Sequence, residues 1–175
     1  MKIGITANPR IPGTPELCRH ILKSIGKGHE VSLEKEIANP LKEKGASFQD
    51  AKFDAILAVG GDGTILRVFQ VADGDVLGVN SGSLGFLAEI MASEVDTYLP
   101  KVLAGDYRVQ TRMRISGNLD GRRLPDCLNE AVLHTAHVSK IRAFEIGVDG
   151  QVAGRVRADG IIVATPTGST APRSM

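Results

Sequence analysis

The sequence predicts an α/β domain with a parallel sheet flanked by helices, followed by a partial, mainly antiparallel β domain. In the first hundred residues, strand-like and helix-like segments alternate, as is typical of parallel strands with helices on the sheet faces. Beyond Gly105 the helical spacing ends, and two-residue turn signals separate strand-like runs. We therefore expect two domains, over residues 1–105 and 106–175.

The first domain opens with a short buried strand at Lys2–Thr6 and a helix from Thr14. Thr14 offers a capping hydroxyl, Pro15 suits the first helical position, and Glu16 lies near the positive end of the helix dipole. Apolar residues at helical spacing carry this helix to Ile25.

The remaining elements of this domain continue the alternation, except that residues 34–44 show no clear pattern. We expect strands at Val31–Leu33, Ala55–Val59 and Val76–Asn80, and helices at Thr64–Ala72 and from Ser93 to Leu103.

Turn signals organise the second domain. Asp120-Gly121 and Asp149-Gly150 are typical of two-residue hairpin turns. Strands at Phe144–Val148 and Val152–Val156 flank the second turn, and Ile161–Ala164 is a further apolar strand. This pattern predicts antiparallel pairing.

The composition excludes several classes of function. A net charge of +1 gives no electrostatic footprint for nucleic acid or an anionic membrane. No uncharged apolar run approaches the ~20 residues that span a bilayer, and the N-terminus lacks the apolar stretch of a signal peptide. Cys18 and Cys127 have no CxxC partner, which favours reduced thiols in a cytoplasmic protein. His134 and His137 would lie on opposite faces of a strand, which argues against a metal pair.

The strongest functional signal is Gly60-Gly61-Asp62-Gly63, between a predicted strand and a predicted helix. Glycines let the backbone approach a bulky anion, and the free N–H groups of the helix start favour phosphate. Asp62 could take a proton or hold Mg²⁺. Taken alone, the motif equally fits a tight turn in which Asp62 merely caps the helix.

Two further motifs favour the phosphate site. Residues 80–87, NSGSLGFL, follow the next strand and should reach the same carboxyl edge, where open α/β sheets bind ligands. Asp159-Gly160, a strand and the loop PTGSTA of residues 166–171 supply a second hydroxyl- and glycine-rich segment.

The motifs GGDGT, NxGxLGFL, Asn129-Glu130 and DGxxxATPTGSTA, in this order, resemble those of NAD kinases. GGDGT also occurs in lipid kinases of the diacylglycerol and sphingosine type, and GGDG in phosphofructokinases, but the other motifs favour NAD kinase. The resemblance covers the chain up to Ala171. It implies phosphoryl transfer from ATP or polyphosphate, with Mg²⁺ or another divalent cation, to the 2′-hydroxyl of the adenosine ribose of NAD, giving NADP.

The resemblance also implies the site residues. Asp62 is the base that takes the proton of the ribose hydroxyl, Phe86 belongs to the adenine pocket, and no side chain is assigned as a direct metal ligand. The residues implied to bind NAD or the donor are Gly61, Gly63, Thr64, Arg67, Asn80, Phe86, Asn129, Glu130, Lys140, Arg157, Asp159, Thr167, Thr170 and Ala171.

Some of these residues have plainer interpretations. Arg67, Lys140 and Arg157 could be solvated basic side chains. Asn129-Glu130 could be an exposed strand pair, and the threonines of the PTGSTA loop could bond their own backbone.

The chain departs from the family after Ala171, where Pro172 stands in place of an expected tyrosine. We therefore expect a C-terminal truncation that leaves an unpaired edge or an apolar face of Ile161–Ala164 exposed. NAD kinase, as a cytoplasmic homo-oligomer, is the leading hypothesis. The alternatives are, from a different class, an inactive dinucleotide-binding fragment or assembly partner and, less favoured, a lipid kinase of the related GGDGT group.

Overall fold

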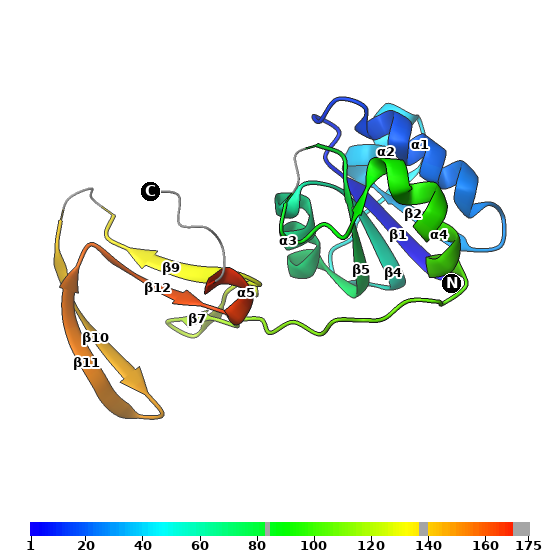
Figure 1. The fold of residues 1–175 in the computed structure, drawn as a ribbon. Helices are drawn as coiled ribbons and strands as arrows, with labels where there is room; N and C mark the ends of the chain where they lie inside the picture. Colours follow the sequence, from blue (N-terminus) through cyan, green and yellow to red (C-terminus); the bar gives the residue numbers. More distant parts are fainter. Residues whose placement is uncertain (83–84, 137–139, 170–175) are drawn as a thin grey trace. The chain divides into compact units, whose positions relative to one another are not determined.

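The computed structural model describes residues 1–82, 85–136 and 140–169, and the chain divides into two compact units, Met1–Thr111 and Arg112–Met175. The first unit alternates strands and helices (Figure 1). Its elements are β1 (Lys2–Ala7), α1 (Thr14–Ile25), β2 (Glu30–Glu34), α2 (Lys35–Leu41), β3 (Gly45–Ala46), β4 (Ala51–Gly60), α3 (Asp62–Val71), β5 (Ala72–Asn80), β6 (Ile90–Met91), the 3₁₀ turn η1 (Ala92–Glu94) and α4 (Val95–Leu103).

The six strands of this unit form one parallel sheet in the order β3-β2-β1-β4-β5-β6. From β1 the chain passes through α1 to β2 on one side, whereas from β4 it passes through α3 to β5 on the other. The strand order therefore reverses between β1 and β4. The α/β prediction for this part of the chain is confirmed.

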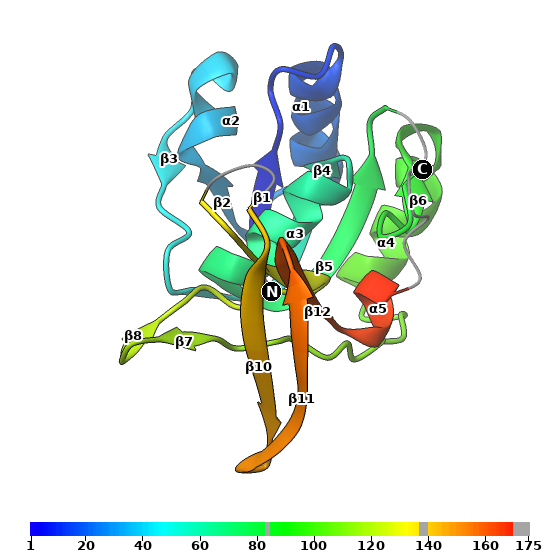
Figure 2. The same cartoon turned by 90° about the vertical axis from the view of Figure 1, so that its left-hand side faces the viewer.

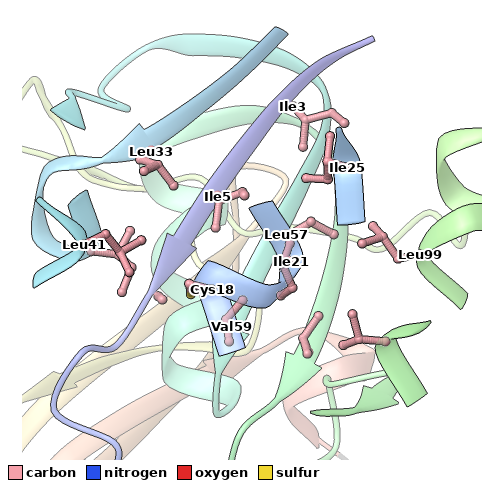
Figure 3. Close-up of a cluster of buried hydrophobic side chains, with 14 of the residues drawn as sticks. Ile3, Ile5, Cys18, Ile21, Ile25, Leu33, Leu41, Leu57, Val59 and Leu99 are labelled. Carbon is pink, nitrogen blue, oxygen red and sulfur yellow. The ribbon is translucent and has the colours of Figure 1, made fainter. Parts of the chain in front are cut away.

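One face of the sheet holds the main hydrophobic core, which Figure 3 shows in close-up. Ile5 of β1 and Val59 of β4 are fully buried there because alternate residues of a strand point to the same face. Helix α1 packs on them through Cys18 and Ile21, and Leu99 of α4 joins the same cluster. Burying each large aliphatic side chain contributes about 1.5–3 kcal/mol.

The opposite face of the sheet carries glycines in β1 and β5 beside the buried Ile56, and α3 covers it (Figure 1). A β-carbon added to Gly78 of β5 would lie 2.5 Å from Cδ1 of Ile65 on α3. A β-carbon on Gly4 of β1 would lie 3.0 Å from the ring of Phe48. These glycines let α3 and the Phe48 ring approach the backbone of the sheet closely.

The second unit consists of two-stranded antiparallel pairs. Its elements are β7 (Asn118–Leu119), β8 (Arg122–Arg123), β9 (Glu130–His134), β10 (Arg142–Val148), β11 (Gln151–Ala158), β12 (Gly160–Ala164) and the short helix α5 (Pro166–Ser169). Both predicted hairpin turns are confirmed: Asp120-Gly121 joins β7 to β8, and Asp149-Gly150 joins β10 to β11 (Figure 2). All four turn residues have positive φ, as a type I′ turn requires.

The β9–β12 pair exposes apolar side chains on both of its faces. Val132 lies opposite Ile162, and these side chains are 55% and 67% exposed. On the other face of the pair, Leu133 and Val163 are also more than half exposed. The expectation that Ile161–Ala164 leaves an apolar face uncovered is therefore confirmed.

Several local expectations differ from the structure. Residues 34–44, which had no clear pattern, contain α2, and Pro40 lies inside this helix. Strands β4 and β5 both begin earlier than their apolar runs because they pair with each other from Ala51 and Ala72 onward. The helix expected from Ser93 starts as η1, and α4 itself begins at Val95.

The prediction that Thr14 caps helix α1 was wrong. Gly13, at φ 82°, is the N-cap, and Thr14 is the first helical residue. The Thr14 hydroxyl does not cap the helix but donates a hydrogen bond to Oγ of Ser81 at 3.0 Å. No helix in the described part of the chain is long and apolar enough to cross a membrane.

We predict that Gly78→Ala destabilises the first unit. The added methyl group would overlap Ile65 and also the backbone of Ala88, whose Cα would lie only 2.8 Å from it, and overpacking of this kind costs about 1–3 kcal/mol. Urea denaturation followed by circular dichroism measures the change. Gly28→Ala is the control because nothing lies within 4 Å of its added β-carbon. Equal stability of the two variants would contradict the close packing of α3.

Candidate functional site

The reversal of strand order brings the loops after β1, β4 and β5 together at the carboxyl edge of the sheet. Ala7 pairs with Val59 and Gly60 with Asn80, so the three strands end at neighbouring positions. The Ser81 N–H donates to the Gly60 carbonyl at 3.3 Å, which joins the loop after β5 to the loop after β4. An open parallel sheet binds its ligands at such an edge.

The glycine-rich turn after β4 leaves an open backbone surface. Gly60, at φ 156°, has no space for a side chain because an added β-carbon would lie 2.4 Å from Oγ1 of Thr64. Gly61 and Gly63 have nothing within 4 Å of such a carbon, so their backbone is accessible. Helix α3 begins at Asp62 with no side-chain cap. Accessible backbone beside an uncapped helix start suits a phosphate group.

The Asp62 carboxylate accepts two backbone hydrogen bonds from the loop that follows β5. The Phe86 N–H donates to Oδ2 at 2.8 Å, and the Leu87 N–H donates to Oδ1 at 3.1 Å. Asp62 is the first residue of α3, and it does not cap the helix. The interpretation of Asp62 as an incidental helix cap is therefore wrong. The GGDG and GFL segments, separate in sequence, meet at this carboxylate.

Phe86 lies in this loop with its side chain 73% exposed. An aromatic ring with so much free surface is not a core residue, and it is available to a planar ligand. Ser83 and Leu84, which precede it in the NSGSLGFL motif, lie outside the described residues.

Asn80 shapes the start of the same loop. Its side chain is buried, with 1% of the residue exposed, and Oδ1 accepts a hydrogen bond from the Gly82 N–H at 2.8 Å. This bond closes a tight turn directly after β5. Asn80 therefore turns the chain at the site edge.

Arg67, one turn into α3, is held by an ion pair on the α3 face of the sheet. Its guanidinium donates to both carboxylate oxygens of Glu34 at 2.6 and 2.5 Å, and to the Thr6 hydroxyl at 2.7 Å. Thr6 in turn donates to Glu34. The Arg67 side chain is 35% exposed and that of Glu34 only 12%. This network joins α3 to the ends of β1 and β2.

The network sets the charge state of Glu34. Burial alone would raise the pKa of this carboxyl, but hydrogen bonds from Arg67 and Thr6, together with the Arg67 charge, lower the pKa below its usual value. The hydrogen bond to Glu34 also raises the pKa of Arg67. Both groups are therefore charged, and the pair is fully formed, at neutral pH.

The sequence analysis missed Thr6, Glu34 and the loop after β1. In this loop Asn8 donates its N–H to the Val59 carbonyl at 3.1 Å, and its Oδ1 accepts from the Arg10 N–H at 3.1 Å. An added β-carbon on Gly60 would lie 3.6 Å from Cβ of Asn8. The only hint in the sequence that this loop belongs to the site was that Asn8 directly follows a buried strand.

In the second unit, Asn129 lies beside the described part of the PTGSTA loop, residues 166–169. The Asn129 carbonyl accepts a hydrogen bond from the Thr165 N–H at 2.8 Å, and a β-carbon on Gly168 would lie 2.3 Å from this carbonyl oxygen. Thr165 is 2% exposed, and its hydroxyl donates to the Leu128 carbonyl at 2.5 Å and accepts from the Gly168 N–H at 3.1 Å. Glu130 starts β9 with its side chain exposed.

The other predicted residues of this unit lie at several places. Thr167 accepts a hydrogen bond from Arg112 at 3.4 Å. Lys140 and Arg157 are exposed, the latter in β11, and the Asp159 carbonyl accepts from the Thr135 N–H at 2.9 Å. Thr170 and Ala171 lie outside the described residues, as does His137.

Cysteines and metal-binding groups offer no second site within the described residues. Both cysteines are free thiols, and burial raises the pKa of Cys18 to about 12, which keeps it protonated. Among the residues that the structure places, no group of three or more His, Cys, Asp or Glu side chains could hold a metal ion.

Comparison with known proteins gives matches along most of the chain. Residues 6–107 match the family model of the ATP-NAD kinase N-terminal domain, and residues 128–172 match that of the ATP-NAD kinase C-terminal domain. The NAD kinase of Thermoplasma acidophilum is 39% identical over 97% of this chain, and that of Methanothermobacter thermautotrophicus is 37% identical over 98%. The chain spans 62% of the length of each of these relatives.

Two solved structures share the fold. Yeast NADH kinase complexed with NADH superposes with a TM-score of 0.81 at 24% identity, covering 98% of this chain and 59% of that one. An NAD kinase from Archaeoglobus fulgidus in complex with ATP superposes with a TM-score of 0.71 at 28% identity, covering 98% and 63%.

We predict that Glu34→Gln lowers the free energy of unfolding by about 1–3 kcal/mol near neutral pH, because it removes a charged hydrogen-bond acceptor while part of Arg67 stays in solvent. The folded-state pKa of Glu34 is lowered, so its stabilisation is complete above the unfolded value of about 4.3 and is lost as the pH falls through the folded value. Urea denaturation over a pH series should therefore show the two proteins converging in acid. The exposed Glu43→Gln is the control, and a similar loss there would contradict the role of the pair.

Proposed function

Since the ATP-NAD kinase N-terminal model alone matches residues 6–107, the chain belongs to the ATP-NAD kinase family, and we propose that it phosphorylates NAD. The reaction transfers a phosphoryl group from ATP or polyphosphate to the 2′-hydroxyl of the adenosine ribose, giving NADP. The observation that carries this proposal is the position of Asp62, a carboxylate in an open glycine turn where the strand order of the sheet reverses.

Asp62 acts as the general base. A ribose hydroxyl is a poor nucleophile, and a positioned carboxylate assists by taking its proton as the bond to phosphorus forms. Each oxygen of Asp62 accepts one backbone N–H and has a further lone pair that can accept the hydroxyl proton. The two backbone bonds therefore orient the base without blocking it.

Each of the two units contributes residues that bind the substrates. Gly61 and Gly63 present accessible backbone to phosphates beside the start of α3, the buried residues Thr64 and Asn80 support this turn and the neighbouring loop, and Phe86 stacks on the adenine. In the second unit the dinucleotide is bound by Asn129, Glu130, Lys140, Arg157, Asp159, Thr167, Thr170 and Ala171. The ion pair with Glu34 supports a role for Arg67 in positioning α3 beside the phosphates rather than in neutralising them directly.

A divalent cation such as Mg²⁺ fits the donor side of this site. Mg²⁺ in kinases is held by one or two carboxylates together with the substrate phosphates, and it neutralises charge on the transferred group. In this site the substrate phosphates would hold such a cation, since Asp62 serves as the base and no side chain is assigned as a direct ligand. ATP as donor is supported by the Archaeoglobus fulgidus relative, whose structure contains ATP. We further propose a cytoplasmic location, which the two free thiols support.

We predict that Asp62→Asn lowers kcat roughly 10²–10⁴-fold, because the amide keeps the shape of the side chain and loses the base. The assay incubates the protein with NAD, Mg²⁺ and either ATP or polyphosphate, and measures NADP. Asp73→Asn, an exposed change at the amino end of β5, should leave the rate unchanged. A rate for Asp62→Asn within a few-fold of the wild type would refute the base.

The same assay separates the alternatives. A wild-type chain that binds NAD and makes no NADP with either donor would be a dinucleotide-binding fragment. Phosphorylation of diacylglycerol or sphingosine in place of NAD would favour the lipid kinase.

We predict that the protein self-associates through the apolar β9–β12 pair, since burying Val132 and Ile162 removes large aliphatic surfaces from water. Light scattering should give a multiple of 18.6 kDa for the wild type. Ile162→Lys should lower the mass toward the monomer, whereas Val148→Lys, a comparably exposed change beside the β10–β11 turn, should not. A monomeric wild type at micromolar concentration would exclude the homo-oligomer.

A further inference from the structure

The two hydrogen bonds of Asp62 hold a loop as well as a side chain. Successive amides, those of Phe86 and Leu87, donate to different oxygens of one carboxylate. This arrangement fixes the orientation of the peptide planes on both sides of Phe86. Hydrogen bonds to a charged acceptor are roughly twice as strong as those between neutral groups, so the carboxylate is a firm attachment point.

Burial contributes little to the position of Phe86 itself. Phe86 is 73% exposed, whereas the next residue, Leu87, is 8% exposed and packs into the unit. After Leu87 the chain is tied to the sheet, since the Glu89 N–H donates to the Gly78 carbonyl at 3.0 Å. On the other side of Leu87, the backbone of residues 85–87 is held by its hydrogen bonds to the Asp62 carboxylate.

Gly85 completes the contact. A β-carbon added there would lie 2.2 Å from Oδ1 and 2.8 Å from Oδ2 of Asp62. Any larger residue would push the carboxylate away from the two amides. The glycine of the GFL segment is therefore explained by the close approach of Asp62.

We propose that Asp62 is also a positioning residue for NAD recognition: its carboxylate holds the Gly85–Leu87 turn and thereby presents the Phe86 ring to the adenine. This inference rests on the proposed function. The Asp62 carboxylate then contributes both to the affinity for NAD and to the chemical step.

The proposal requires a carboxylate, because only a carboxylate offers two acceptor oxygens at this distance. An asparagine has one acceptor oxygen and one NH₂ group. In Asp62→Asn the NH₂ group would face a backbone N–H, so one bond is lost and two donors oppose each other. The turn should open even though the side chain keeps its shape.

Residue-resolved hydrogen exchange on the whole chain tests the attachment without any substrate. In Asp62→Asn the amides of Phe86 and Leu87 should exchange roughly tenfold faster or more, and amides of β4 should not change. The matched control Asp73→Asn should leave the exchange of both amides as in the wild type. Unchanged exchange at Phe86 and Leu87 in a folded Asp62→Asn protein would overturn the proposal.

Isothermal titration with NAD then tests the consequence through a double-mutant cycle. Asp62→Asn and Phe86→Ala should each weaken binding, and the double variant should bind no more weakly than Phe86→Ala alone, because Asp62 acts through Phe86. Full additivity of the two losses would show that Asp62 does not position the ring. A wild type that binds no NAD would refute the proposed function, and the exchange experiment would still decide the attachment.

Gly85→Ala tests the attachment from the loop side, because it retains the carboxylate but displaces it from the two amides. In an active protein we expect a KM for NAD raised at least several-fold, together with faster exchange of the Phe86 and Leu87 amides, as in Asp62→Asn. Thermal melts confirm that each variant is folded. An unchanged KM, with unchanged exchange at Phe86, would overturn the inference by this independent route.

Discussion

The parallel pairing of β1 with β4 at the centre of the sheet is the constraint on which the site depends. The chain leaves these two strands in opposite directions, but the loops that follow them lie side by side at the carboxyl edge, where the backbone of Gly61 and Gly63 is accessible. The glycine turn, the loop after β1 and the turn at Asn80 all meet at this point. The chemistry of Asp62 is therefore available because of where the strand order reverses.

Much of the fold was predictable because its signals are local. Buried strands, the apolar stripe of α1 and the two Asp-Gly turns are patterns within a few residues, and the structure confirms them. Helix α2 was missed because its stabilisation comes from tertiary contacts: Ile37 and Leu41 are buried in the core, but the seven-residue helix contains Pro40 and is too short to show a period.

The site was predictable only in part, for a related reason. The position of Asp62 follows from one motif, but its contact with Phe86 joins residues from two motifs. Glu34 carries no motif, and its partners Thr6 and Arg67 are far away in the sequence. Polar residues whose importance comes from distant partners look like ordinary strand ends in a single sequence. In the second unit Thr165 is a similar case, since its buried hydroxyl links Leu128 to Gly168.

Helix α3 contacts the sheet partly through the backbone at Gly78, and this contact has a mechanical consequence. The main core face is filled by flexible aliphatic side chains, which can repack when one of them changes volume. On the other face the Ile65 side chain meets the backbone at Gly78, and backbone cannot change rotamer to absorb a displacement. The contact of Ile65 with the backbone at Gly78 therefore fixes the position of α3 and of the turn that precedes it. A change of volume at Gly78 or Ile65 therefore moves α3 as a whole, whereas a change among the aliphatic core side chains can be met by repacking.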